Sequence, residues 1–151
     1  MMAPAGSEHG GIIENVAFHL SGFVRSHKLG KIFGAETGFF IHRNPDTVRA
    51  PDVAFVRAER LSAKLPKGFF EGAPDLAVEV LSPEDRPGYV QAKIRDWFDA
   101  GCLAVWIVDP GDETVTIYEG TRDAVVLHRD ETQTDARVLP GFSVAVSEIF
   151  E

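Results

Sequence analysis

The stretch LAVEVLSP at residues 76–83 constrains the fold more than any other part of the sequence. In a β-strand, side chains alternate between two faces, so Leu76 and Val78 point one way and Ala77 and Glu79 the other. Both faces are apolar apart from the carboxylate of Glu79, a pattern typical of a central strand covered on each side. Ionised carboxylates are almost never fully buried alone, so Glu79 needs a partner, and we expect a cation.

A helix and a second apolar strand follow this stretch. Val90, Ile94 and Trp97 recur at helical spacing before Gly101, and LAVWIVDP at residues 103–110 is again apolar. A strand, a helix and a strand in this order form a crossover unit whose two strands lie parallel in one sheet. The sequence therefore predicts an α/β fold, a mixed sheet flanked by helices.

The remaining elements are shorter. An amphipathic helix begins near Ser7, which we expect to cap it, and ends before Gly30. The segments KIFGAETGFFIH and TVRAPDVAFVR, the latter interrupted by Pro51, predict a β-meander. Residues 114–129 predict a hairpin, and the closing LPGFSVAVSEIF predicts a strand with a short turn. At 151 residues without a linker, we expect one domain over residues 1–151.

Composition excludes several classes of protein. The net charge of -8 argues against non-specific coating of nucleic acid, but a cluster of acidic metal ligands is compatible with it. No apolar stretch approaches the roughly 18–20 residues of a membrane helix, and MMAPAGSEHGG is not a secretory signal, so a cytoplasmic location is the default expectation. Cys102 is the only cysteine, and we expect a small buried hydrophobic residue.

Three acidic residues lie at or near predicted strands. Asp52 shares a face with Ala54 in one strand, and Glu79 lies in another. Two carboxylates on neighbouring strands can bind a hard cation such as Mg²⁺, which prefers oxygen ligands. Asp75 is a further candidate, although it could simply start its strand. Glycine-rich phosphate loops and the GxSxG and HExxH motifs are missing, so nucleotide-binding, serine-hydrolase and zinc-protease functions lack support.

Three other candidates stay open on the residues alone. Lys93 lies one helical turn from Trp97 and could stabilise charge on a phosphate, but composition favours a solvated lysine along Trp97. His9 could touch a substrate or metal, but a helix cap or a surface position is favoured. Glu14 lies at the edge of the first helix's apolar face, where a solvated side chain is usual.

Several strings together resemble a known family. RAPDVAFV, GAPDLAVEVLSPEDR, AGCLAVWIVDP, LPGF and the N-terminal SEHGGIIENVAFHL are similar to the Uma-two (Uma2) family of restriction endonuclease-like proteins, over nearly the whole chain. That family resembles a branch of the PD-(D/E)XK nuclease superfamily. The resemblance implies a restriction endonuclease-like core, a mixed sheet flanked by helices. It also implies carboxylates that bind Mg²⁺, or alternatively Mn²⁺, for hydrolysis of phosphodiester bonds in DNA.

The resemblance assigns roles to individual residues. Asp52 and Glu79 match the acidic metal ligands, and Leu81 stands where the usual strand lysine would be. Lys93 matches a lysine displaced onto the following helix, which makes it a catalytic candidate with Asp52 and Glu79. His9 and Glu14 match a recurring N-terminal pattern of the same cleft.

Leu81 leaves a second hypothesis open. The chain could be a catalytically lapsed interaction or nucleic-acid-binding domain with a nuclease fold, in which Glu79 forms a structural ion pair with Lys93 or another cation. A homodimer is expected in either case, because one small acidic domain offers little basic surface for gripping a duplex and two copies could share the task.

Overall fold

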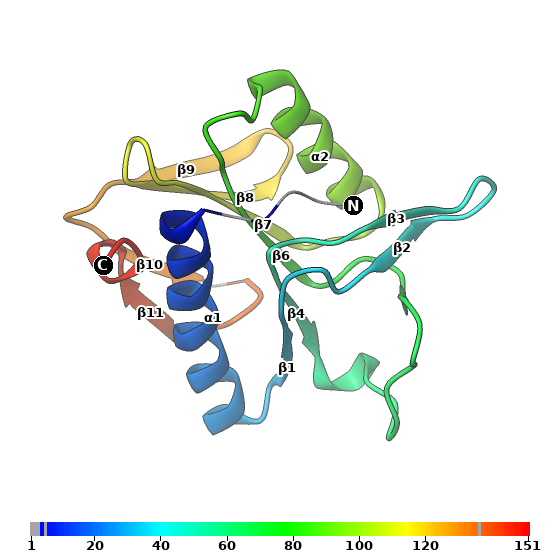
Figure 1. The fold of residues 1–151 in the computed structure, drawn as a ribbon. Helices are drawn as coiled ribbons and strands as arrows, with labels where there is room; N and C mark the ends of the chain where they lie inside the picture. Colours follow the sequence, from blue (N-terminus) through cyan, green and yellow to red (C-terminus); the bar gives the residue numbers. More distant parts are fainter. Residues whose placement is uncertain (1–3, 5, 136) are drawn as a thin grey trace.

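A six-stranded mixed sheet forms the centre of the molecule (Figure 1). The computed structural model describes residues 4, 6–135 and 137–151. The strand order is β1-β4-β6-β7-β8-β9, in which β6 and β7 run parallel and all other neighbours run antiparallel. The strands are β1 (Gly30–Phe33), β4 (Val53–Arg57), β6 (Leu76–Val80), β7 (Ala104–Asp109), β8 (Thr114–Gly120) and β9 (Asp123–Leu127).

Both faces of the sheet are covered. On one face lie α1 (Ser7–His27), α3 (Val146–Ile149) and the hairpin of β10 (Thr132–Asp135) with β11 (Phe142–Ala145). On the other face lie α2 (Pro87–Asp99) and a small sheet of β3 (Thr47–Arg49), β2 (Phe39–His42) and β5 (Phe70–Glu71). The short 3₁₀ helix η1 (Ala58–Arg60) follows β4.

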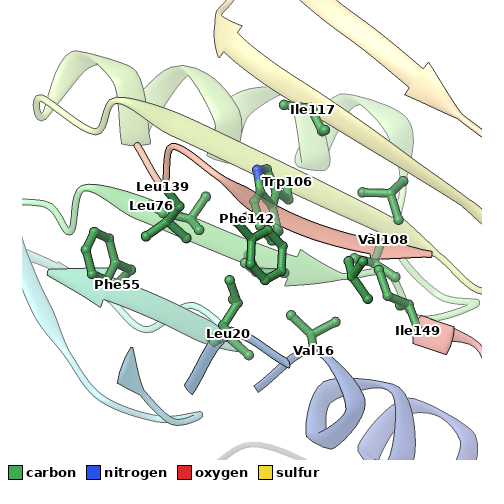
Figure 2. Packing of buried hydrophobic residues seen from close by; sticks show 14 of the residues in the cluster. Val16, Leu20, Phe55, Leu76, Trp106, Val108, Ile117, Leu139, Phe142 and Ile149 are labelled. Atoms are coloured by element: carbon green, nitrogen blue, oxygen red, sulfur yellow. The ribbon is translucent and has the colours of Figure 1, made fainter. Parts of the chain in front are cut away.

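The core on the first face is large and apolar (Figure 2). The buried stripe of α1, including Val16 and Leu20, packs against the strand residues Phe55 and Leu76. The ring of Trp106 stacks on that of Phe142 at 5.8 Å, which ties β11 to the centre of the sheet. Burial of this apolar surface is the main stabilising contribution to the fold.

The strand LAVEV separates two cores, as the sequence predicts. Leu76 and Val78 belong to the first core, and Ala77 packs on the second face with Ile94 and Trp97 of α2. All five residues of β6 are buried. Because Glu79 shares the face of Ala77, its side chain points toward α2.

The crossover unit is confirmed. β6 pairs in parallel with β7 in the register Leu76↔Ala104 through Val80↔Val108, and α2 connects them. The hairpin of β8 and β9 and the closing strand with its helical turn are also confirmed. Cys102 is buried, which raises the pKa of its thiol to about 12, as befits a small buried residue.

The predicted meander is wrong in its pairing. β1 pairs with β4, whereas β2 pairs with β3 and β5 in the separate small sheet. The strand expected across Pro51 is divided between these two sheets. Phe39 explains the departure, because its fully buried ring packs in the second core and so draws β2 over the sheet face.

The expected Ser7 cap is also wrong. Ser7 is already the first helical residue, and the extended Gly6 precedes it as N-cap, without a side-chain cap hydrogen bond. The carbonyl oxygen of Gly6 accepts the first helical hydrogen bond from the Gly10 N–H at 2.9 Å. Among the described residues, no helix is long and apolar enough to cross a membrane.

Candidate active site

The structure brings Asp52 and Glu79 together on neighbouring strands. β4 and β6 pair in the register Val53↔Val78, and extending that register by one residue sets Asp52 opposite Glu79. Residues directly opposite each other in an antiparallel pair point to the same face. Both carboxylates therefore face the side of the sheet that α2 covers.

Glu79 is buried, with 5% of its surface exposed, and α2 supplies its partners. The Lys93 ammonium lies 3.1 Å from Glu79 Oε2, and the Trp97 indole N–H donates to the same oxygen at 3.2 Å. Lys93 and Trp97 are four residues apart and so lie on one face of α2. The interpretation of Lys93 as a solvated residue is wrong, because its ammonium turns inward to the carboxylate.

Asp52 is held by the backbone of β6. Its N–H donates to the Val78 carbonyl oxygen at 3.1 Å, and its Oδ2 accepts from the Val80 N–H at 2.7 Å. Just before β4 begins, the Asp52 carboxylate thus accepts from a backbone N–H of β6, as a strand carbonyl oxygen would. This bond fixes the orientation of Asp52 at the edge of the site.

Burial is the main cause of the raised pKa of both carboxyl groups. The pKa of Asp52 is raised above 3.8 by desolvation, against the lowering effects of the Val80 N–H, His9 and Lys93. Desolvation also raises the pKa of Glu79 above 4.5, and the nearby charge of Asp52 raises it further, while Lys93 opposes the shift. The two carboxylates thus repel each other, and a cation between them would relieve that repulsion.

His9 reaches the same place from α1. Its Nε2 lies 2.7 Å from the carbonyl oxygen of Val80, and its Nδ1 is buried with no hydrogen-bond partner among the described residues. A carbonyl only accepts, so Nε2 carries the proton in this bond. The expectation of a cap or surface position is wrong, because His9 links the start of α1 to the end of β6.

Glu14 and Asp75 lie apart from this group. Glu14 is exposed on α1. Asp75 precedes β6 at its opposite end, where its Oδ2 accepts from the Arg57 N–H at 2.8 Å and lies 3.2 Å from Arg60 Nη1. These contacts hold the entry to β6 in place.

A cleft of about 540 Å³ opens next to His9 and Asp85, and neither Asp52 nor Glu79 lines it. Its walls come from the start of α1, the loop after β6, α2 and the strands β7 and β8, and its ionisable lining residues include Glu8, His9, Asp85 and Asp109. No lysine or arginine of the described chain lines it. A phosphate entering this cleft would meet mainly negative charge.

A narrower cavity adjoins the cleft. It has a volume of about 10 Å³, enough for roughly one water-sized group, and Glu79, Lys93 and Asp85 line it. Leu81 lines both the cleft and the cavity, so the position where the family pattern has a strand lysine is apolar here. The ammonium of Lys93 reaches Glu79 from α2 instead.

The donor set fits a divalent cation bound by two protein carboxylates. Within the described residues, the hydrogen bonds and ion pairs of this pair use Asp52 Oδ2 and Glu79 Oε2, which leaves Oδ1 and Oε1 for a ligand. No group of three or more His, Cys, Asp or Glu in the described part is placed to hold a metal. Mg²⁺ commonly takes one or two carboxylates and completes its shell with water and phosphate oxygens, which matches such a pair.

Sequence reasoning missed two contributors to the site. The negative charge of Asp85 raises the pKa of Asp52, and Trp97 donates to Glu79. The helical spacing of Lys93 and Trp97 carried a signal for the second. Asp85 lies in the loop SPEDRP, where turn formation was a sufficient explanation, so periodicity could not have found it.

The fold, with its carboxylate pair and helix-borne lysine, is that of a restriction endonuclease-like protein. The Uma2 family model, described as "Putative restriction endonuclease", matches residues 1–147, and the chain belongs to this family. The crystal structure of "a putative nuclease belonging to DUF820" from Anabaena variabilis ATCC 29413 matches with a TM-score of 0.80 at 21% identity. The match covers 99% of this chain and 83% of that chain. Comparison with curated proteins gives no match.

Proposed function

We propose that this protein is a Mg²⁺-dependent DNA endonuclease, with Mn²⁺ as an alternative metal, and that Asp52, Glu79 and Lys93 form its active site. The observation that carries the proposal is the placement of two carboxylates side by side with an ammonium 3.1 Å from one of them. Membership of the Uma2 family supports a nucleic-acid substrate.

Asp52 and Glu79 would hold the cation through their free oxygens. A divalent cation supplies Lewis-acid polarisation of a phosphoryl oxygen and favours ionisation of water. Lys93 contributes a compact positive charge that stabilises negative charge developing on the phosphodiester. The Val80 backbone orients both Asp52 and His9, so these side chains need little rearrangement when substrate enters.

The surface proposed to bind DNA lies outside the acidic cleft, near Arg60 and Asp75, at the end of the sheet opposite Glu79. The loop before β5 carries the exposed Lys64 and Lys67, and Phe69 beside them is 51% exposed. Positive side chains beside an exposed aromatic ring bind phosphates and stack bases without sequence preference. This surface is compatible with DNA binding despite the net charge of -8.

The test is cleavage of supercoiled plasmid, single-stranded DNA and RNA in Mg²⁺ or Mn²⁺. We expect wild-type protein to cut DNA, and Asp52→Asn, Glu79→Gln and Lys93→Met each to lose roughly 10²-fold or more in rate, since each removes charge at the reacting phosphate. Glu84→Gln and Arg95→Met remove exposed charges and serve as matched controls. Wild-type rates in Asp52→Asn or Glu79→Gln would contradict the proposal.

A catalytically lapsed domain is the second candidate. Leu81 in the strand-lysine position and the Glu79–Lys93 ion pair favour it, because the pair neutralises Glu79 without a metal. This function predicts no cleavage of any substrate with either metal, together with binding of DNA that Lys64→Glu weakens.

A further inference from the structure

β9 is an exposed edge of the central sheet. It pairs with β8 on one side, and on its other side no strand of the described chain follows. Four of its five residues are exposed, and Val125 and Val126 are 56% and 49% exposed. Alternation places these two valines on opposite faces, so both faces of the edge present apolar surface.

This edge lacks the features that protect sheet edges. Its sequence DAVVL holds no lysine, proline or glycine, and its only charge is at its first residue. The opposite edge, β1, is shorter and carries Gly30 and the exposed Lys31. An apolar edge with free backbone N–H and C=O groups is a template for pairing with another strand.

We propose that β9 pairs antiparallel with β9 of a second copy of this chain, across a two-fold axis at Val126. In this register Val126 faces Val126, and Val125 faces Leu127, so apolar side chains meet on both faces. Moving the two-fold axis by one residue to Val125 would place the charged Asp123 opposite the apolar Leu127. Moving it to Leu127 would place the apolar Val125 opposite the charged Arg129.

Charge selects the same register. Continued beyond the strand, a pair centred on Val126 would bring Asp123 toward Arg129 of the second copy and Arg122 toward Asp130, where Arg122, Arg129 and Asp130 lie in the turns that flank β9. Arg129 lies in the turn after β9, where it is exposed and 3.0 Å from Glu113 of its own chain. Opposite charges across paired strands stabilise the pair, and the two-fold axis uses each contact twice.

The pairing would also set the two clefts on one face. Thr116 and Tyr118 of β8 line the cleft and pair with Val126 and Ala124 of β9. A two-fold axis through an antiparallel pair lies perpendicular to the sheet, so both clefts open on the same side. Two clefts on one face would allow a dimer to cut both strands of a duplex only if the proposed nuclease function holds. The proposal of the dimer does not depend on that function.

Sedimentation of the full chain tests the dimer. We expect wild type to be dimeric, and Val126→Lys to weaken the dimer at least about tenfold, because two ammonium groups then face each other at the axis. Val48→Lys places the same charge on an exposed valine of β3 and serves as control. A monomeric wild type at the highest soluble concentration, or an unchanged dimer in Val126→Lys, would overturn the proposal.

Charge exchange and cross-linking test the register. Asp123→Arg and Arg129→Asp should each weaken the dimer, and the double variant should restore it. Val126→Cys should form a disulfide-linked dimer on oxidation faster than Val125→Cys. The two copies of residue 126 lie directly opposite each other in this register, whereas residue 125 lies opposite residue 127 of the second copy. The native Cys102 is buried and does not compete. Failure of the double variant to recover would refute this register. Cleavage assays are scored separately, so loss of activity in a stable dimer bears only on the proposed function.

Discussion

At the scale of single residues, Glu79 shows how one carboxylate is tolerated in an apolar strand. Its partners Lys93 and Trp97 both come from α2 and contact Oε2, whereas Asp52 faces it from β4 and repels it. Burial still dominates and raises its pKa. The site is therefore held together by hydrogen bonds and one ion pair while it keeps unfavourable negative charge, a combination typical of functional centres.

The raised pKa predicts how stability changes with pH. The folded carboxyl of Glu79 takes up a proton at higher pH than the unfolded one, whose ordinary value is 4.5. Its contribution to stability is thus fully present below 4.5 and is lost as the pH rises through the folded pKa. As the pH is lowered from neutral, the free energy of unfolding of wild type should rise relative to that of Glu79→Gln. Urea denaturation at stepped pH measures this, and a difference independent of pH would contradict it.

At the scale of elements, the hairpin of β10 and β11 contains a second unusual residue. Gln133 is fully buried opposite Val144, and neither its amide nitrogen nor its oxygen has a hydrogen-bond partner in the described part of the chain. Both carboxylate oxygens of Asp135, two residues later, accept hydrogen bonds. One accepts from the Trp106 indole N–H and the other from three backbone N–H groups. The hairpin is anchored by Asp135 and weakened by Gln133.

Replacing this amide should stabilise the protein. Gln133→Met keeps the length of the side chain and removes two unsatisfied polar atoms, so we expect a gain of about 1–3 kcal/mol in the free energy of unfolding. Thr134→Ala, at the exposed neighbouring position, should change it by less than about 0.5 kcal/mol. Denaturant titration of both variants checks the expectation, and a loss of stability in Gln133→Met would mean that the amide has a partner in solution.

At the scale of the whole molecule, α1, the sheet and α2 converge on the two carboxylates. His9 comes from α1, Asp52 and Glu79 from two strands, and Lys93 from α2. A ligand held between the two carboxylates would link these elements, so its binding energy would add to the stability of the entire fold.

Metal binding should therefore raise the melting temperature. At a metal concentration ten times the Kd, mass action adds about 1.4 kcal/mol, which corresponds to roughly 3–6 °C for a chain of this size. Thermal melts of wild type and Asp52→Asn with Mg²⁺, Mn²⁺ and no metal measure the shift. The shift should vanish in Asp52→Asn, and an equal shift in both proteins would place the metal elsewhere.

Local patterns predicted much of this fold. The crossover unit of β6, α2 and β7, the hairpin of β8 and β9 and the first helix all follow from periodicity and from turn residues, which act between neighbours in the chain. The same patterns identified Asp52 and Glu79 as charges in apolar strands, and the family resemblance singled out Lys93.

Partners distant in the chain were decided only by tertiary structure. Strand periodicity is the same whichever strand lies alongside, so it could not show that β1 pairs with β4 or that Phe39 packs into the second core. The contacts of His9 with Val80 and of Trp97 with Glu79 likewise span 71 and 18 residues. The sequence by itself determined which side chains needed partners, because burial follows local pattern. The tertiary structure decided which partners they found, because contact between distant segments depends on how the whole chain packs.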